Sequence, residues 1–305
     1  MRRIALVTFA VAALALLSSA CGLVPVPAPP PPDTTTTTTE PATGPVAEQV
    51  DDTHWWVTNP GTGARLWVTV VAPAETTDSP LPGVVMVPGG SADSSGLIRD
   101  AQTIAAGGYL VVLFDPDGRG QSEGVEDYNG ADQQAGLAEV VRFAATLPAV
   151  DPDRLAIATN SYGITMGAGA LASYDDLGVD LLIDWEGPAD RTDTGGCNGQ
   201  GPVGHISHDC SDESWWAERE AATFIGAVDV AYVRLQSATD HVQPDAEHAL
   251  RMINAALNGN AALVVLNTTV IDEPLEAIDP ALLVPDSADR YRASLVVASL
   301  DTYLD

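Results

Sequence analysis

The stretch that most constrains the fold runs from Leu155 to Ala170 and reads LAIATNSYGITMGAGA. A short apolar run ends at Thr159, Ser161 follows, and a stretch of small residues with helical character begins at Gly163. This order predicts a strand, a sharp turn and a helix, with the serine hydroxyl at the apex. Small residues suit such a turn because the strand and the helix pass close together. The stretch matches the nucleophile-elbow pattern G-x-S-x-G, except that Thr159 replaces the first glycine.

The segments on either side of this turn alternate between apolar runs and helical patterns. Strands are predicted at 54–57, 64–71, 83–87, 109–114, 179–184, 228–235 and 261–266. Helices are predicted at 97–106, 137–147, 211–222, 245–257 and 287–304, with Ser211 as the N-cap of the third. Strands that alternate with helices indicate an α/β domain with a mostly parallel sheet, covered by helices on both faces.

The net charge limits the choice of partner. The chain has 305 residues, with 13 basic residues, none of them lysine, against 42 acidic residues, for a net charge of −29. Such a surface repels phosphate backbones, so no nucleic-acid partner is expected. An apolar content of 46% is enough for one large core.

The N-terminus has the pattern of a bacterial export signal. Two arginines precede a short apolar run within residues 1–20, which are predicted to be a signal peptide. The residues before Cys21 resemble a lipobox, which predicts lipidation of Cys21 and attachment to the membrane outside the cytoplasm, with soluble secretion as the alternative. Residues 21–46 are rich in proline and threonine and are predicted to be a tether, which leaves 47–305 as the folded domain. In an oxidising compartment the two remaining cysteines, Cys197 and Cys210, are predicted to form a disulfide.

Four motifs together carry a resemblance to a known superfamily. They are VMVPGG at 85–90, FDPDGRGQSEG at 114–124, ATNSYG at 158–163 and SATDHVQP at 237–244. In their order and spacing, residues 48–305 resemble the α/β-hydrolase superfamily, in particular its dienelactone-hydrolase-like and prolyl-oligopeptidase-like members. The resemblance implies that fold, with 187–226 as a short insertion or cap after the sixth strand that bears both cysteines.

The resemblance also implies catalytic roles for individual residues. Ser161 would be the nucleophile, and Asp240 would be the acid that orients a histidine. The amides of Tyr162 and Gly90, or of Ser91 in place of Gly90, would form the oxyanion hole. Alternative roles remain for two of these residues, since Asp240 also suits the N-cap of the 245–257 helix and Tyr162 also suits packing at the turn.

The histidine that the resemblance requires after the last strand is missing. The five histidines are His54, His205, His208, His241 and His248, and the segment where the base is expected, 267–274, reads NTTVIDEP. The base would then come from His241, which adjoins Asp240, or from His205 or His208 in the insertion. The alternatives are an inactive protein that binds a ligand on the same fold, or a reaction in which Ser161 is not the nucleophile.

No metal or cofactor is predicted. His205 and His208 are separated by two residues and lack the i, i+4 helical spacing of the common zinc motif. The sequence therefore predicts an extracytoplasmic serine hydrolase that cleaves a small ester or related acyl substrate through an acyl-enzyme on Ser161. The inactive ligand-binding or cell-envelope lipoprotein is the alternative.

Overall fold

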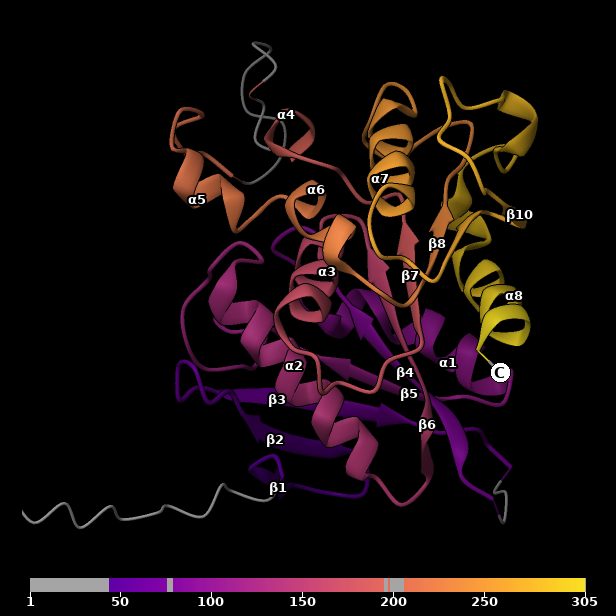
Figure 1. Cartoon of the computed structure of the whole chain (residues 1–305). Coiled ribbons are helices and arrows are strands. Elements are labelled where there is room, and N and C mark those ends of the chain that lie inside the picture. Colours follow the sequence, from indigo (N-terminus) through magenta and orange to yellow (C-terminus); the bar gives the residue numbers. More distant parts are fainter. Residues whose placement is uncertain (1–43, 76–78, 195–196, 198–205, 305) are drawn as a thin grey trace, which may run out of the picture. The chain divides into compact units, whose positions relative to one another are not determined.

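The residues that the structure describes are organised around one sheet of ten strands (Figure 1). The structure is a computed structural model, and it describes residues 44–75, 79–194, 197 and 206–304. The strand order is β1-β2-β3-β5-β4-β6-β7-β8-β9-β10. From β5 to β9 the neighbouring strands are parallel, while β1, β2, β3 and β10 pair antiparallel with their neighbours. This agrees with the predicted mostly parallel sheet.

The strands are β1 (Ala47–Gln49), β2 (His54–Thr58), β3 (Arg65–Val71), β4 (Leu81–Val87), β5 (Leu110–Phe114), β6 (Val150–Asn160), β7 (Leu181–Trp185), β8 (Ala231–Leu235), β9 (Leu263–Leu266) and β10 (Thr269–Val270). The α-helices are α1 (Ile98–Ala106), α2 (Ala131–Thr146), α3 (Gly163–Ser173), α4 (Arg191–Thr194), α5 (Glu213–Ala217), α6 (Ala221–Phe224), α7 (Glu247–Leu257) and α8 (Arg292–Tyr303). Four short 3-10 helices are η1 (Ser94–Leu97), η2 (Ile225–Ala227), η3 (Pro280–Leu282) and η4 (Ala288–Arg290).

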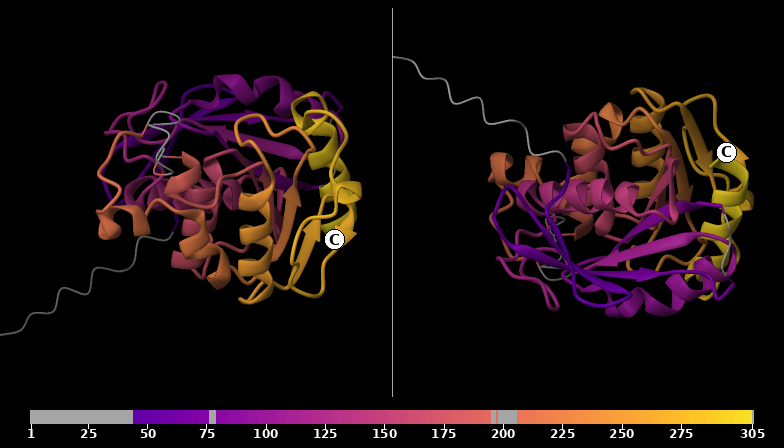
Figure 2. Two further views of the ribbon diagram at one scale, coloured as in Figure 1. Left: turned by 90° about the horizontal axis from the view of Figure 1, so that it is seen from above. Right: turned by 90° about the horizontal axis from the view of Figure 1, so that it is seen from below.

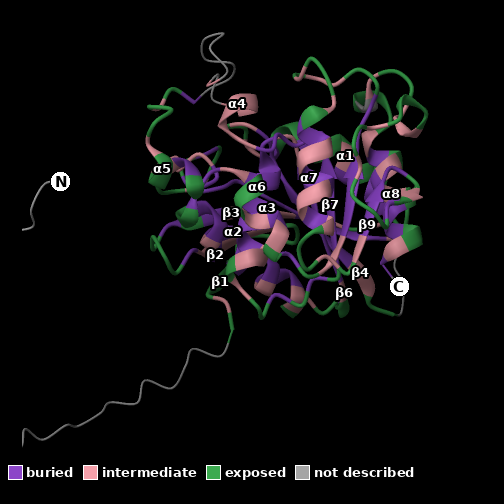
Figure 3. Ribbon diagram, turned by 45° about the horizontal axis from the view of Figure 1, so that its top comes forward, coloured by how far each residue is buried: buried purple, intermediate pink, exposed green. Residues whose placement is uncertain are grey.

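Helices cover both faces of the central strands, because alternate residues of each strand point to opposite faces. In β4, Val85 and Val87 pack in the cluster that includes α2, α3 and α7, while Val84 and Met86 pack in the cluster that includes α1 and α8. Figure 3 shows the central strands as buried, and Figure 2 shows α8, in yellow, from above and below. The continuous apolar runs of the sequence therefore reflect strands that are buried from both sides.

The insertion after β7 differs from its prediction in one detail. The single helix predicted at 211–222 is two short helices, α5 and α6, separated by residues 218–220. The N-cap of α5 is Asp212 in place of Ser211, and its carboxylate accepts from the amide of Trp215 at 3.2 Å. The interruption has a structural cause, since the backbone carbonyl of Arg219 accepts the hydroxyl of Tyr162 and so turns toward the elbow.

Within the described residues, none of the helices combines the length and the apolar character needed to cross a membrane. The predicted signal peptide, the lipidation site at Cys21 and nearly all of the tether lie outside the described residues.

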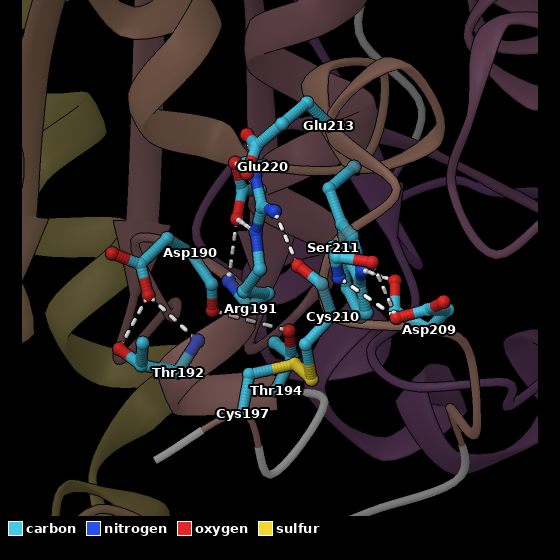
Figure 4. Close-up of a disulfide and its surroundings, with 11 residues drawn as sticks. Asp190, Arg191, Thr192, Thr194, Cys197, Asp209, Cys210, Ser211, Glu213 and Glu220 are labelled. Atoms are coloured by element: carbon cyan, nitrogen blue, oxygen red, sulfur yellow. Dashed lines mark hydrogen bonds and ion pairs between the residues drawn. A yellow bond between two sulfur atoms is a disulfide. The ribbon is translucent and has the colours of Figure 1, made fainter.

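The predicted disulfide between Cys197 and Cys210 is present and closes a loop with a sequence separation of 13 residues (Figure 4). Arg191 lies beside it and donates to the carbonyl oxygen of Cys210 at 2.9 Å. The same guanidinium pairs with Glu220 at 2.7 Å and with Glu213 at 2.9 Å. The disulfide and the arginine therefore join α4 to the segment that leads into α5.

Reduction of this disulfide is expected to lower the free energy of unfolding by about 3 kcal/mol, because the unfolded chain loses the constraint of a closed loop. Urea denaturation of the protein with and without reductant measures the difference, and intact mass before and after reduction counts the two hydrogens gained. The Cys197→Ser/Cys210→Ser double variant should match the reduced protein. Equal midpoints for all three samples would show that the bond contributes nothing to stability.

Candidate active site

Ser161 lies at the apex of a strained turn between β6 and α3. Its φ is +51°, a backbone conformation that non-glycine residues rarely adopt and that is concentrated at functional sites. Its amide donates to the carbonyl oxygen of Trp185 at 2.8 Å. Gly163 has no room for a side chain, because a Cβ there would lie 2.6 Å from the carbonyl oxygen of Pro88. The predicted strand, sharp turn and helix are therefore all present.

The threonine that replaces the first glycine of the elbow pattern is accommodated by a glycine in the helix. A Cβ on Gly167 would lie 2.6 Å from the methyl carbon of Thr159. The hydroxyl of Thr159 donates to the carbonyl oxygen of Ile183 at 3.1 Å. β6 and α3 therefore still pass close together, because the small residue at their contact is Gly167 of α3 and not a glycine of β6.

Strand register brings the loops after β6, β7 and β8 to the same edge of the sheet. Asn160 lies opposite Trp185, and Trp185 lies opposite Leu235. The next residues, Ser161 and Glu186, therefore leave neighbouring strands at the same level. In open α/β sheets this edge, at the carboxyl ends of the strands, is where ligands bind.

His241, on the loop after β8, connects Ser161 to Glu186. Its Nε2 lies 2.9 Å from the hydroxyl oxygen of Ser161, and its Nδ1 lies 2.8 Å from a carboxylate oxygen of Glu186. An ionised carboxylate only accepts, so Nδ1 carries the proton and Nε2 is free to accept from the serine. The three side chains have the arrangement of a serine, histidine and acid triad.

Glu186 is held rigidly for this role. Its side chain is fully buried, and its φ is +46°. One carboxylate oxygen accepts from the hydroxyl and the amide of Ser237, and the other accepts from the amide and Nδ1 of His241. Four donors around a buried carboxylate fix its orientation.

Asp240, which the sequence predicts as the triad acid, lies further from the imidazole than Glu186. Its closest carboxylate oxygen is 3.4 Å from Nδ1 of His241, against 2.8 Å for Glu186. Nor is it the N-cap of α7, which begins after Ala246. Its carboxylate instead accepts from the amides of Val242 and Gln243, in the turn that follows His241.

The segment after β9, where the resemblance places a histidine, begins with Asn267. Its side-chain oxygen accepts from the amide of Gln236 at 3.0 Å, and its side-chain nitrogen donates to the carbonyl oxygen of Gln236 at 2.9 Å. Asn267 therefore supports the end of β8, from which the His241 loop starts. The resemblance places the acid after β8 and the histidine after β9, whereas Glu186 follows β7 and His241 follows β8.

The other histidines do not approach Ser161 in the described part of the chain. His208 lies 2.9 Å from Asp212 and stacks on Trp215, and His248 is buried near Asp240. His205 lies outside the described residues. Among the described residues, the one cluster of possible metal ligands is Glu186, Asp240 and His241, whose atoms are already hydrogen-bonded to one another and to nearby amides.

The predicted oxyanion loop passes directly against the elbow. A Cβ on Gly89 would lie 2.5 Å from the carbonyl oxygen of Asn160, and Gly90 has a φ of +55°. Within the described residues, the amides of Gly90 and Tyr162 have no hydrogen-bond partner. Both residues line the cavity that contains Ser161. Two unpaired amides beside a serine are suited to receive an oxyanion.

The side chain of Tyr162 points away from this chemistry. Burial raises the pKa of the Tyr162 phenol, so it stays protonated and donates to the carbonyl oxygen of Arg219 at 2.9 Å. The buried side chain of Asn129 donates to the carbonyl oxygen of Tyr162 at 2.8 Å. The residue after the serine is therefore fixed both by the insertion and by the loop before α2.

A cavity of about 380 Å³ opens beside Ser161, which is the size range of small-molecule sites. Its wall is largely apolar and includes Tyr128, Trp185, Pro188, Ile206 and Val242. Its charged groups are mostly paired: Arg292 binds Asp100, and Asp193 binds Arg251. Because Ile206 and residues 193–194 contribute to the wall, the insertion forms part of the pocket.

The fold is therefore the α/β-hydrolase fold, with a serine, a histidine and a glutamate meeting at the carboxyl edge of its sheet. The family model of X-Pro dipeptidyl-peptidase (S15 family) matches residues 62–204, a range that includes Ser161 and Glu186 but ends before His241. Thiohydrolase apmlB of Arthrinium phaeospermum is 31% identical over 105 residues, which are 33% of this chain and 34% of that protein.

Solved structures share the fold at low sequence identity. The acylaminoacyl peptidase of Pyrococcus horikoshii matches with a TM-score of 0.59 and 14% identity, over 86% of this chain and 42% of that one. Dipeptidyl peptidase 4 of Porphyromonas gingivalis matches with a TM-score of 0.62 and 15% identity, over 86% and 36%. Acetyl xylan esterase 1 of Thermoanaerobacterium sp. JW/SL YS485 matches with a TM-score of 0.55 and 15% identity, over 82% and 87%. The chain spans about a third of the curated relative and about two fifths of the acylaminoacyl peptidase.

Proposed function

We propose that this protein is a serine hydrolase in which Ser161, His241 and Glu186 form the catalytic triad. The observation that carries the proposal is the pair of contacts made by His241, at 2.9 Å to the serine oxygen and 2.8 Å to the glutamate. The alternative of an inactive binding protein was motivated by the missing C-terminal histidine. That reason is weakened by a histidine within hydrogen-bonding distance of Ser161.

The proposed reaction proceeds in two steps. The Ser161 oxygen attacks the acyl carbon while its proton passes to Nε2 of His241, and the amides of Gly90 and Tyr162 stabilise the oxyanion. The protonated histidine then gives its proton to the leaving group, which departs and leaves an acyl-enzyme on Ser161. Water, deprotonated by the same Nε2, attacks this acyl group, and release of the acid restores the serine.

The bond that is cleaved is proposed to be an ester or a related acyl bond in a small substrate. The names of the similar proteins include peptidases, an esterase and a thiohydrolase, so they share acyl transfer and differ in the leaving atom. The mostly apolar wall of the cavity favours an uncharged acyl group. An ester is preferred to an amide because its leaving group needs less help from a general acid.

Turnover of p-nitrophenyl acetate by the purified protein tests this proposal, with Ser161→Ala beside it. The variant is expected to lose at least about 10⁶-fold in kcat, because no acyl-enzyme can form. A fluorophosphonate probe should attach covalently to Ser161 in the unmodified protein alone. Equal turnover by both proteins, or the absence of labelling at Ser161, would reject it as the nucleophile.

We further propose that the protein is exported and anchored to the membrane by lipid on Cys21. The proposal is supported by the export pattern of residues 1–20 and by the disulfide, a bond that persists mainly in oxidising compartments. Cys21→Ser is expected to move the protein from the membrane fraction to the soluble fraction when cells are fractionated. Unchanged partitioning would reject lipidation, and Cys21→Ser should leave esterase activity intact.

A further inference from the structure

A group of buried polar side chains lies behind the triad and takes no part in the proposed chemistry. Arg234 and Gln236, in and after β8, are fully buried, and so is Asp184 of β7. His248 of α7 is 1% exposed, and the side chain of Asp240 is 2% exposed. Burying this many polar and charged groups is costly unless each has partners, so their contacts call for an explanation.

The carboxylate of Asp240 is surrounded by donors on both of its oxygens. One oxygen accepts from the amides of Val242 and Gln243, at 2.8 and 2.7 Å. The other accepts from the side-chain amide of Gln236 at 2.9 Å and lies 3.2 Å from Nε2 of His248. Burial raises the pKa of Asp240, but these hydrogen bonds outweigh it and hold the pKa well below its usual value. Asp240 is therefore a fixed negative charge.

Arg234 connects this carboxylate to the other side of the triad. One of its terminal nitrogens donates to Asp184 at 2.6 Å and to the carbonyl oxygen of Gly187 at 2.7 Å, directly after Glu186. The other donates to Gln236 at 2.6 Å, and Gln236 donates in turn to Asp240. A single buried guanidinium thus supports the backbone beside Glu186 and, through Gln236, the loop of His241.

Asp240 also acts on the imidazole through space. Its carboxylate oxygen lies 3.4 Å from Nδ1 of His241, on the side where Glu186 already accepts the proton. The ring of Trp185 lies against the imidazole, with centroids 4.4 Å apart. The other charged groups that line the cavity are Asp193, Asp289 and Arg292. Apart from Glu186, Asp240 is the charged side chain of the described residues that contacts the imidazole.

We propose that Asp240 is a positioning residue for the reaction described above, held by His248 and by the relay from Arg234 through Gln236. It fixes the main chain after His241, and it places a second negative charge beside the imidazole that Glu186 orients. The inference rests on the proposed function for its kinetic consequence, while the contacts with His241 do not depend on that function.

The substitution Asp240→Asn tests the proposal while keeping the size of the side chain. Its oxygen can still accept from the amides of Val242 and Gln243. The acid limb of the kcat/KM profile is expected to move to lower pH, because the negative charge 3.4 Å from Nδ1 of His241 is removed. We expect kcat at the optimum to fall by on the order of 10²-fold, with KM little changed.

A readout independent of activity is the NMR titration of the His241 ring, assigned with a His241→Gln sample. Its midpoint should move in the same direction in Asp240→Asn. The matched control is Asp245→Asn, which removes an exposed carboxylate from the same loop and should leave both the midpoint and kcat unchanged. If the unmodified protein shows no turnover and no fluorophosphonate labelling, the proposed function fails, while the NMR comparison still decides the charge effect.

Asp240→Glu separates the effect of the charge from the effect of the main-chain contacts. It also replaces Asp240→Asn as the test if circular dichroism shows that Asp240→Asn does not fold. It keeps the charge but displaces the carboxylate, so kcat should fall while the titration midpoint stays near that of the unmodified protein. An unchanged midpoint and unchanged kcat in Asp240→Asn would overturn the proposal. So would an equal midpoint shift in Asp240→Glu and Asp240→Asn, since the shift would then not follow the charge.

Discussion

His241→Gln is expected to lower kcat by about 10⁶-fold, the largest effect of any change in this protein apart from loss of the nucleophile itself. Without a base at 2.9 Å, the proton of Ser161 has no acceptor, and the hydroxyl remains a weak nucleophile. The side chain of His241 is 18% exposed and lines a cavity, so its replacement should leave the fold intact. Esterase kinetics and a thermal melt measure the two quantities separately.

The control for this prediction is His208→Gln. His208 stacks on Trp215 in the insertion and pairs with Asp212, away from Ser161. Its loss should leave kcat unchanged, although the insertion loses an ion pair. If His208→Gln were as inactive as His241→Gln, the base would have to come from the insertion, and the triad described above would be wrong.

Glu186→Gln is expected to lower kcat by about 10⁴-fold with little change in KM. An amide at this position can donate to Nδ1 of His241, which places the ring proton on Nε2 and removes the acceptor for Ser161. The effect should exceed that of Asp240→Asn by about two orders of magnitude, because Asp240 does not hold the ring proton. The two variants are compared in the same esterase assay, with Glu247→Gln, an exposed residue of α7, as the control.

The opposite ranking would assign the acid differently. If Asp240→Asn were the more damaging change and Glu186→Gln nearly neutral, Asp240 would be the triad acid, as the order of motifs in the sequence suggests. Equal and small effects from both would mean that neither carboxylate orients the imidazole during the reaction.

Much of the fold could be predicted from the sequence because its signals are local. Buried parallel strands are continuous apolar runs, and the elbow is a strand, a serine and a row of small residues within 16 positions, 155–170. The prediction of a single helix at 211–222 is wrong, because a tertiary contact interrupts it. The contact of the Arg219 carbonyl with Tyr162 breaks a pattern that would otherwise form one helix.

The acid of the proposed triad could not be predicted from the sequence, because its position depends on the register between distant strands. Glu186 follows β7, and it meets His241 only because Trp185 lies opposite Leu235 in the sheet. The sequence offers His241 as a candidate base beside Asp240, yet its closest carboxylate partner comes from another strand. The available signal was the missing C-terminal histidine, combined with a lone acidic residue directly after a central strand.

The position of the proposed triad in the chain also bears on how this protein can be altered. Both proposed partners of Ser161 precede residue 242, so in this proposal the segment between Asn267 and Arg292 supplies none of the groups that move protons. Within that segment, the exposed side chain of Asp289 lines the cavity. Substitutions at Asp289 should therefore change which molecules enter while leaving the reaction chemistry intact.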